Sequence, residues 1–192
     1  ISACLVGSEM CIRDRDGTQL WRYEDPKASC LDIRMDSNFP VTDIDSDGVP
    51  ELVCARKIGA VLHLCIVNAR TGELKKSVPY PDRKGMPRNA KGGHFRSSVS
   101  VINASGKDVP SDILVGWDYR SVTLLDRQLE TIWNRQIGRH RRRRHMTMGH
   151  TPFCADIDGD GCDEILAGSV LLDQDGTVLW VAPDLPALLA DG

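Results

Sequence analysis

The chain has 192 residues, 41% hydrophobic and 27% charged, so it is long enough to bury a core. Its formal net charge of −3 at pH 7 gives no reason to expect a nucleic acid or a membrane surface as partner. No apolar run reaches about 18 residues, and no transmembrane span is predicted.

The N-terminal segment, residues 1–15, reads "ISACLVGSEMCIRDR" and lacks the order of regions found in a signal peptide. It resembles translated sequencing-adapter read-through at the end of an assembled reading frame. We therefore expect residues 1–15 to be artefactual or disordered, and we assign the fold to residues 16–192. The C-terminal "LPALLADG" ends without a closing element, so a fragment of a longer protein is expected.

An acidic motif repeats along the chain. "TDIDSDGVPELVCAR" (42–56) and "ADIDGDGCDEILAGS" (155–169) match in register. Between them, "INASGKDVPSDILVGW" (102–117) is a degenerate copy in which Asp112 replaces the Glu of the other two. A repeat of about 50–60 residues is typical of arrays and propellers.

A second motif, which begins with Asp and ends with Trp, predicts hairpin turns. It occurs as "DRDGTQLW" (14–21), "DRQLETIW" (126–133) and "DQDGTVLW" (173–180), with "NARTGELK" (68–75) as a looser relative. Around these turns, short apolar or alternating runs predict strands, which lie at 39–43, 51–56, 60–67, 73–78, 97–103, 111–117, 121–126, 130–137, 151–156, 163–168, 169–173 and 177–182.

Four strands per repeat, joined by tight turns, predict an all-β fold of the β-propeller type. The blades are expected at about 37–80, 94–137 and 150–183, after the last strand of a preceding blade. The remaining blades would be supplied by the rest of the full-length chain. Helices are expected to be nearly absent, because no segment has a 3.6-residue period.

The two acidic loops have the oxygen spacing that Ca²⁺ requires. In each loop, three Asp at alternate positions are followed by Gly, a backbone carbonyl and a Glu. The predicted calcium ligands are Asp43, Asp45, Asp47, the Val49 carbonyl and Glu51 in the first loop, and Asp156, Asp158, Asp160, the Cys162 carbonyl and Glu164 in the second.

These loops have two other possible interpretations. An EF-hand needs a Glu at position 12 and flanking helices, but that position is Cys54 or Ala167 and the flanks are strand-like. A solvated acidic turn without metal is the plainer alternative, and it stays open. No ion is expected in the middle copy, where Ala104, Gly106 and Asp108 replace the three Asp.

Two histidines and several cations are the candidates for chemistry. His150, and His94 one repeat earlier, stand where the chain enters an inner strand, so they are candidate catalytic bases or structural residues. Arg139 lies in the basic run "GRHRRRRHMTMGH" (138–150), and Lys91 and Arg96 flank His94. These three are candidate ligands for an acidic substrate, with a solvated loop as the alternative. Without a CxxC pair, most of the seven Cys are expected to be small buried residues.

The loops "DIDSDGVPEL" and "DIDGDGCDEI" resemble those of FG-GAP/VCBS calcium-binding β-propeller repeats. The segment "GHTPFCADIDGDGCDEILAGSVLLDQDGTVLW" (149–180) is similar to part of the family 11 rhamnogalacturonan lyases. This resemblance implies a secreted, extracellular, calcium-dependent polysaccharide lyase that cleaves pectin by β-elimination, with only His150 carried over at motif level. A non-catalytic calcium-stabilised propeller module that binds carbohydrate or protein is the alternative.

Overall fold

Every element of the computed structural model is a β-strand. The structure describes residues 2–6, 9–24, 33–35, 39–58, 61–81, 95–117, 121–137 and 151–182. Within these ranges, no helix is long and apolar enough to cross a membrane. The chain divides into two compact units, each of which is described by itself.

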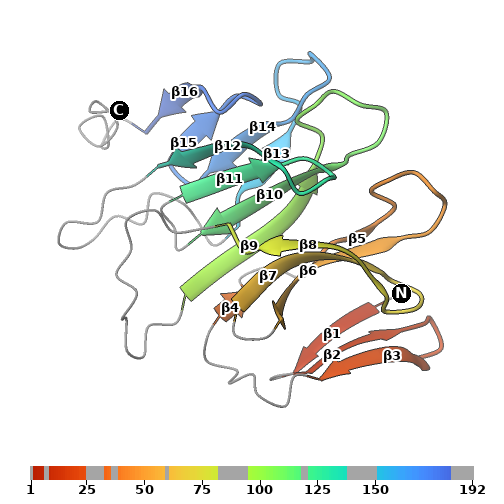
Figure 1. Ribbon diagram of the computed structural model, residues 1–192. Helices are drawn as coiled ribbons and strands as arrows, with labels where there is room; N and C mark the ends of the chain where they lie inside the picture. Colours follow the sequence, from red (N-terminus) through yellow and green to blue (C-terminus); the bar gives the residue numbers. More distant parts are fainter. Residues whose placement is uncertain are drawn as a thin grey trace. The chain divides into compact units, whose positions relative to one another are not determined.

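The first unit contains two antiparallel sheets (Figure 1). The first sheet has three strands, β1 (Ser2–Val6), β2 (Glu9–Arg13) and β3 (Gln19–Glu24). The second has four, β5 (Val41–Thr42), β6 (Glu51–Ile58), β7 (Val61–Asn68) and β8 (Leu74–Pro79). Consecutive strands are neighbours in both sheets, so each is an up-and-down meander.

The second unit repeats this arrangement (Figure 1). One meander contains β9 (Phe95–Ile102), β10 (Asp112–Trp117), β11 (Ser121–Leu125) and β12 (Thr131–Gln136). The short strand β4 (Ile33–Met35) follows β3 in the chain. The other meander contains β13 (Phe153–Ala155), β14 (Glu164–Ala167), β15 (Val170–Leu172) and β16 (Val178–Val181).

The strand pattern predicted from the sequence is confirmed for the three complete repeats, whose twelve strands all fall on the predicted runs. The expectation that residues 1–15 are artefactual or disordered stays a prediction. Residues 2–6 and 9–13 form β1 and β2, and β2 pairs with β1 on one side and with β3 on the other. Ile12 provides a fully buried apolar side chain in this sheet, and Asp14 closes the turn that follows β2. Whether this segment is read-through stays a prediction.

Asp side chains close the predicted hairpins between the last two strands of a sheet. Asp14 Oδ1 accepts hydrogen bonds from the backbone N–H groups of Asp16 and Thr18, both at 2.9 Å. Asp126 Oδ1 accepts the same pair from Gln128 and Glu130, at 2.8 and 2.9 Å. These bonds satisfy turn donors that the strand ladder leaves free.

The looser hairpin after β7 is one residue longer than the others. Its closing backbone bond runs from Asn68 N to Glu73 O, whereas the corresponding bond of the first hairpin runs from Asp14 N to Thr18 O. The extra residue shifts the following strand by one position. As a result, Lys76 and not Lys75 stands opposite Ile66, in the place that Trp21 takes opposite Ile12.

Tryptophan side chains connect consecutive sheets inside each unit. In the first unit, Trp21 Nε1 donates to the Ala69 carbonyl at 2.8 Å, and a Cβ added at Gly72 would lie 2.8 Å from Trp21 Cδ2. In the second, Trp133 Nε1 donates to the Gln174 carbonyl at 2.9 Å, and its ring covers Gly176. Each turn glycine is therefore required by close approach of an indole as well as by a positive φ.

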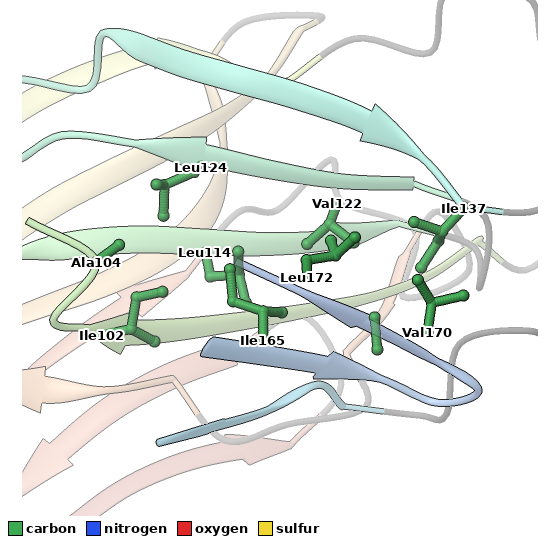
Figure 2. Packing of buried hydrophobic residues seen from close by; sticks show 10 residues of the cluster. Ile102, Ala104, Leu114, Val122, Leu124, Ile137, Ile165, Val170 and Leu172 are labelled. Carbon is green, nitrogen blue, oxygen red and sulfur yellow. The ribbon is translucent and has the colours of Figure 1, made fainter. Parts of the chain in front are cut away.

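The core of the second unit lies between its two meanders (Figure 2). The cluster draws apolar side chains from both sheets, namely Ile102, Ala104, Leu114, Val122, Leu124, Ile137, Ile165, Ala167, Val170 and Leu172. All ten are at most 8% exposed. This packing holds the starts of β10 and β14 in place. Asp112 is the first residue of β10, and Glu164 is the first residue of β14.

Two of the described cysteines, Cys54 and Cys65, face each other across β6 and β7 as buried free thiols. Burial raises the pKa of Cys54 to about 12 and that of Cys65 to about 11. Such thiols stay protonated and pack as small apolar groups, as the sequence predicted.

Candidate metal-binding loops

The two acidic loops join the first and second strands of their sheets and share one backbone conformation. The first loop runs from β5 to β6 and the second from β13 to β14. Positive φ angles occur at Ser46 (62°) and Gly48 (84°) in the first, and at Gly159 (85°) and Gly161 (90°) in the second. The left-handed positions turn the chain back on itself, and so the carboxylates point to a common centre.

The first Asp of each loop holds the turn from inside. Asp43 accepts hydrogen bonds from the N–H groups of Asp47 and Gly48, at 3.0 and 2.9 Å. Asp156 accepts from those of Gly159 and Gly161, at 2.7 and 3.1 Å.

The Glu of each loop is the first residue of the following strand and is almost completely buried. Glu51 is 0% exposed and Glu164 is 1% exposed. One oxygen of each accepts a hydrogen bond from the loop, from Ile44 N at 3.0 Å and from Ile157 N at 2.7 Å, respectively. A buried carboxylate needs further partners, because burial without compensation is costly.

The predicted ligands partly converge in both loops. Single oxygens of three acids lie within 4.8 Å of one another, and the groups are Asp43, Asp45 and Glu51, and Asp156, Asp158 and Glu164. Neither group includes the third Asp of its loop, Asp47 or Asp160. Oxygen atoms at this separation can surround one hard cation. Ligation by the carbonyls of Val49 and Cys162 stays a prediction.

In the first loop, a lysine side chain occupies the space among the carboxylates. Lys75 Nζ lies 2.8 Å from Asp45 Oδ2, 3.0 Å from Asp47 Oδ2 and 2.8 Å from Glu51 Oε1. These contacts raise the pKa of Lys75, first through Asp45 and then through Glu51. The Lys75 hydrogen bond lowers the pKa of Asp47.

Within the described residues, no cation pairs with the acids of the second loop. Asp160 Oδ2 accepts a hydrogen bond from the neutral Gln174 Nε2 at 3.1 Å. Glu164 Oε1 is buried and has no hydrogen-bond partner. A fifth acid, Asp163, adds to the negative charge and accepts from Asn103 N at 2.7 Å.

The unpartnered Glu164 oxygen is the observation that fits a metal at the second loop. It belongs to a side chain that is 1% exposed, and it is in the group that includes Asp156 and Asp158. The thiol of Cys162 is not suited to join them, because sulfur is a soft ligand and Ca²⁺ is a hard cation. The donors on offer are all oxygens, which are the ligands Ca²⁺ prefers.

The degenerate middle copy keeps the buried acid and the third Asp, Asp108, but has Ala104 and Gly106 in place of the first two Asp. Asp112, 0% exposed, accepts a hydrogen bond from Ser105 N at 2.8 Å, and Lys107 Nζ lies 3.7 Å from its other oxygen. Here too a lysine accompanies a buried carboxylate. The sequence analysis assigned no role to Lys107, Lys75 or Gln174. Lys107 lies within its own loop and could have been noticed there, whereas Lys75 is 24 residues from Glu51 and gives no local signal.

The residues predicted for catalysis and substrate binding are not among those whose side chains the structure describes. His94, Lys91, Arg139 and His150 lie outside the described residues. Arg96 belongs to β9, but its side chain is not among those that the structure describes. Their roles stay predictions.

No protein-family model matches the sequence. The chain is similar to the rhamnogalacturonan exolyase YesX of Bacillus subtilis (strain 168), with 24% identity over 207 residues. The match covers 86% of this chain and 32% of YesX, so the chain spans about a third of that relative.

Solved rhamnogalacturonan lyases have a similar fold. YesX matches with a TM-score of 0.66 and 22% identity, covering 90% of this chain and 34% of YesX. YesW and the Bacillus licheniformis lyase PL11 each match with a TM-score of 0.65 and 19% identity, covering 90% of this chain and 35% of theirs. The V. cholerae biofilm matrix protein Bap1 matches with a TM-score of 0.54 and 15% identity, covering 91% of this chain and 24% of Bap1.

Proposed function

We propose that this chain is part of a rhamnogalacturonan lyase that cleaves acidic pectic polysaccharide by β-elimination. The observation that carries the proposal is the sequence similarity to YesX, which extends over 86% of the chain. Three lyase structures with the same fold support it. Since pectic substrates are extracellular polymers, the protein that contains this chain would be secreted.

The antiparallel sheets are proposed to be blades of a β-propeller of the FG-GAP/VCBS type. The repeats at about 37–80, 94–137 and 150–183 each supply a four-stranded meander. The rest of a lyase-length protein would supply the remaining blades, because a ring needs at least about four.

Calcium is proposed at the second loop. Asp156, Asp158, Asp160, Glu164 and the Cys162 carbonyl would hold it, and the unpartnered Glu164 oxygen supports this choice. The ion would neutralise carboxylates that have no cation among the described residues, and so it would stabilise the turn between β13 and β14. Its proposed role is structural.

His150 and His94 are the proposed bases for the elimination. A neutral imidazole can accept the C5 proton of the uronate, while the glycosidic oxygen leaves C4 and a C4–C5 double bond forms. Arg96, Lys91 and Arg139 are proposed to bind the uronate carboxylate, since its neutralisation makes the C5 proton more acidic.

The test is to incubate the full-length protein that contains this chain with rhamnogalacturonan and calcium, and to follow the absorbance of unsaturated uronate. We expect product, and a loss of at least about 100-fold in kcat when the base histidine is replaced by alanine. Product formation that survives both His150→Ala and His94→Ala would remove these residues from the mechanism. Absence of product from the folded wild type would overturn the lyase.

The second candidate is a non-catalytic module that binds carbohydrate or protein, favoured by the similarity to the biofilm matrix protein Bap1. The same incubation separates the two functions. Retention of the protein on immobilised polysaccharide, without unsaturated product, is the result expected of a binding module.

A further inference from the structure

Lys75 comes from a part of the sequence that the acidic motif does not include. It lies in β8, and its ammonium group reaches three carboxylates of the first loop within 3.0 Å. Its side chain is 26% exposed, and the Glu51 side chain that it contacts is 0% exposed. The contacts therefore join a half-buried cation to a fully buried anion, for which the Coulomb attraction is stronger than at an open surface.

The backbone position of Lys75 recurs in the other sheets. In each sheet the last strand has a β-bulge that leaves one residue without a cross-strand partner. That residue is Lys75 in β8, and it is Leu20 in β3, Ile132 in β12 and Leu179 in β16. The last three are exposed apolar side chains, 43%, 51% and 51% exposed. The first acidic loop is therefore the one that has a cation at this position.

The two loops differ in how their buried Glu is satisfied. Glu51 uses both oxygens, one toward Ile44 N and one toward Lys75 Nζ. Glu164 uses one oxygen toward Ile157 N, and the other has no partner. In the first loop, the buried oxygen without a hydrogen-bond partner is Asp45 Oδ1. The other oxygen of the same carboxylate, Oδ2, accepts a hydrogen bond from Lys75. Apart from Asp45 Oδ1, the buried carboxylate oxygens of the first loop have hydrogen-bond partners within the protein.

The middle loop also has a lysine near its buried acid, although no hydrogen bond joins the two side chains. Two of its three ligand-type Asp are replaced, by Ala104 and Gly106, and Asp108 keeps the third. The buried Asp112 has Lys107 Nζ at 3.7 Å from its Oδ1, an oxygen that accepts no hydrogen bond. Lys107 belongs to the loop itself, whereas Lys75 comes from the last strand of its sheet. Two of the three loops thus place a lysine beside the buried acid from different points in the chain.

We propose that Lys75 is a built-in cation that takes the place of a divalent metal ion in the first loop. The first loop then folds without metal, while the second depends on one, a contrast that rests on the calcium proposed for the second loop. Four carboxylates and one ammonium leave a formal charge of −3 in the first loop, from Asp43, Asp45, Asp47, Glu51 and Lys75. The second loop reaches the same value only when a divalent cation joins its five acids, Asp156, Asp158, Asp160, Asp163 and Glu164.

The experiment counts the calcium ions bound by the chelator-stripped protein, by calorimetric titration with calcium alone. Lys75→Leu copies the residue found at the bulge of β16, and it should add one calcium ion to the count. Leu179→Lys is the matched exchange at the second loop, and it should remove one ion. An unchanged count in folded Lys75→Leu would overturn the proposal.

A second variant keeps the test valid if Lys75→Leu does not fold. Asp45→Asn should leave the calcium count of the wild type unchanged, because no ion is bound there. Loss of one ion in Asp45→Asn would show that the first loop binds calcium, and it would overturn the proposal. Asp158→Asn tests the second loop separately. An unchanged calcium count in this variant would contradict the calcium site of the proposed function. The counts of Lys75→Leu and Asp45→Asn would still test the first loop.

Discussion

The two acidic loops have the same spacing of carboxylates and the same backbone turn, yet their surroundings differ. A lysine lies among the acids of the first loop, and the second loop has no cation paired with it among the described residues. A motif thus specifies where oxygen atoms converge, whereas residues far away in sequence decide which positive charge they receive. Lys75 is 24 residues from Glu51, so no local pattern reveals it.

The largest effect that separates the loops is expected from removing the charge of the buried Glu. Glu51→Gln leaves Lys75 with one fewer carboxylate, and it should lower the free energy of unfolding by about 2 kcal/mol with or without calcium. In calcium-containing buffer, Glu164→Gln should lower the free energy of unfolding by a similar amount. In chelator it should raise the free energy of unfolding, because the wild-type carboxylate then has no cation beside it. Urea unfolding in both buffers measures this, and equal responses of the two variants to chelator would remove the contrast.

Backbone strain should instead affect the two loops equally. Gly48→Ala and Gly161→Ala introduce a Cβ at φ angles of 84° and 90°, with nothing within 4 Å to obstruct it. Each should therefore cost about 1–2 kcal/mol, from the left-handed backbone alone. Thermal unfolding of both variants in saturating calcium checks the prediction. A cost at one loop only would mean that their turns are not equivalent.

A smaller effect is expected where the loops differ by one turn residue. Ser46 adopts a φ of 62° in the place where the second loop has Gly159. Ser46→Gly should stabilise the first loop by about 0.5–1 kcal/mol, because relief of the strain exceeds the added entropy of the unfolded chain. The reverse exchange, Gly159→Ser, should destabilise the second loop, and denaturant midpoints compare the pair.

The smallest effect concerns acid pH. The hydrogen bond from Lys75 lowers the pKa of Asp47 from its ordinary value of 3.8. The associated stability is present above pH 3.8 and is lost as the pH falls through the lower, folded-state pKa. Asp47→Asn should therefore flatten the stability profile below about pH 4, and Lys75→Gln should flatten it over the same range. Acid-unfolding curves that keep their wild-type slope would contradict this.

Much of the fold could be predicted from the sequence because its signals are local. Strand alternation and Asp-closed turns located the meanders of the three repeats, and the spacing of Asp156, Asp158 and Glu164 identified one convergent group. The added residue after Asn68 could not be recognised in the same way, since the "NARTGELK" segment aligns with the other hairpins without a gap. That residue places Lys75 at the bulge, and hence at the loop.

The indole of Trp180 has a practical consequence for solution studies. Trp21 and Trp133 are half-buried against turn glycines, one in each unit, whereas Trp180 is 49% exposed. A dissolved quencher such as iodide should extinguish the emission of Trp180 before theirs. Once the emission of Trp180 is quenched, the remaining fluorescence reports melting of the first unit through Trp21 and of the second unit through Trp133 and Trp117.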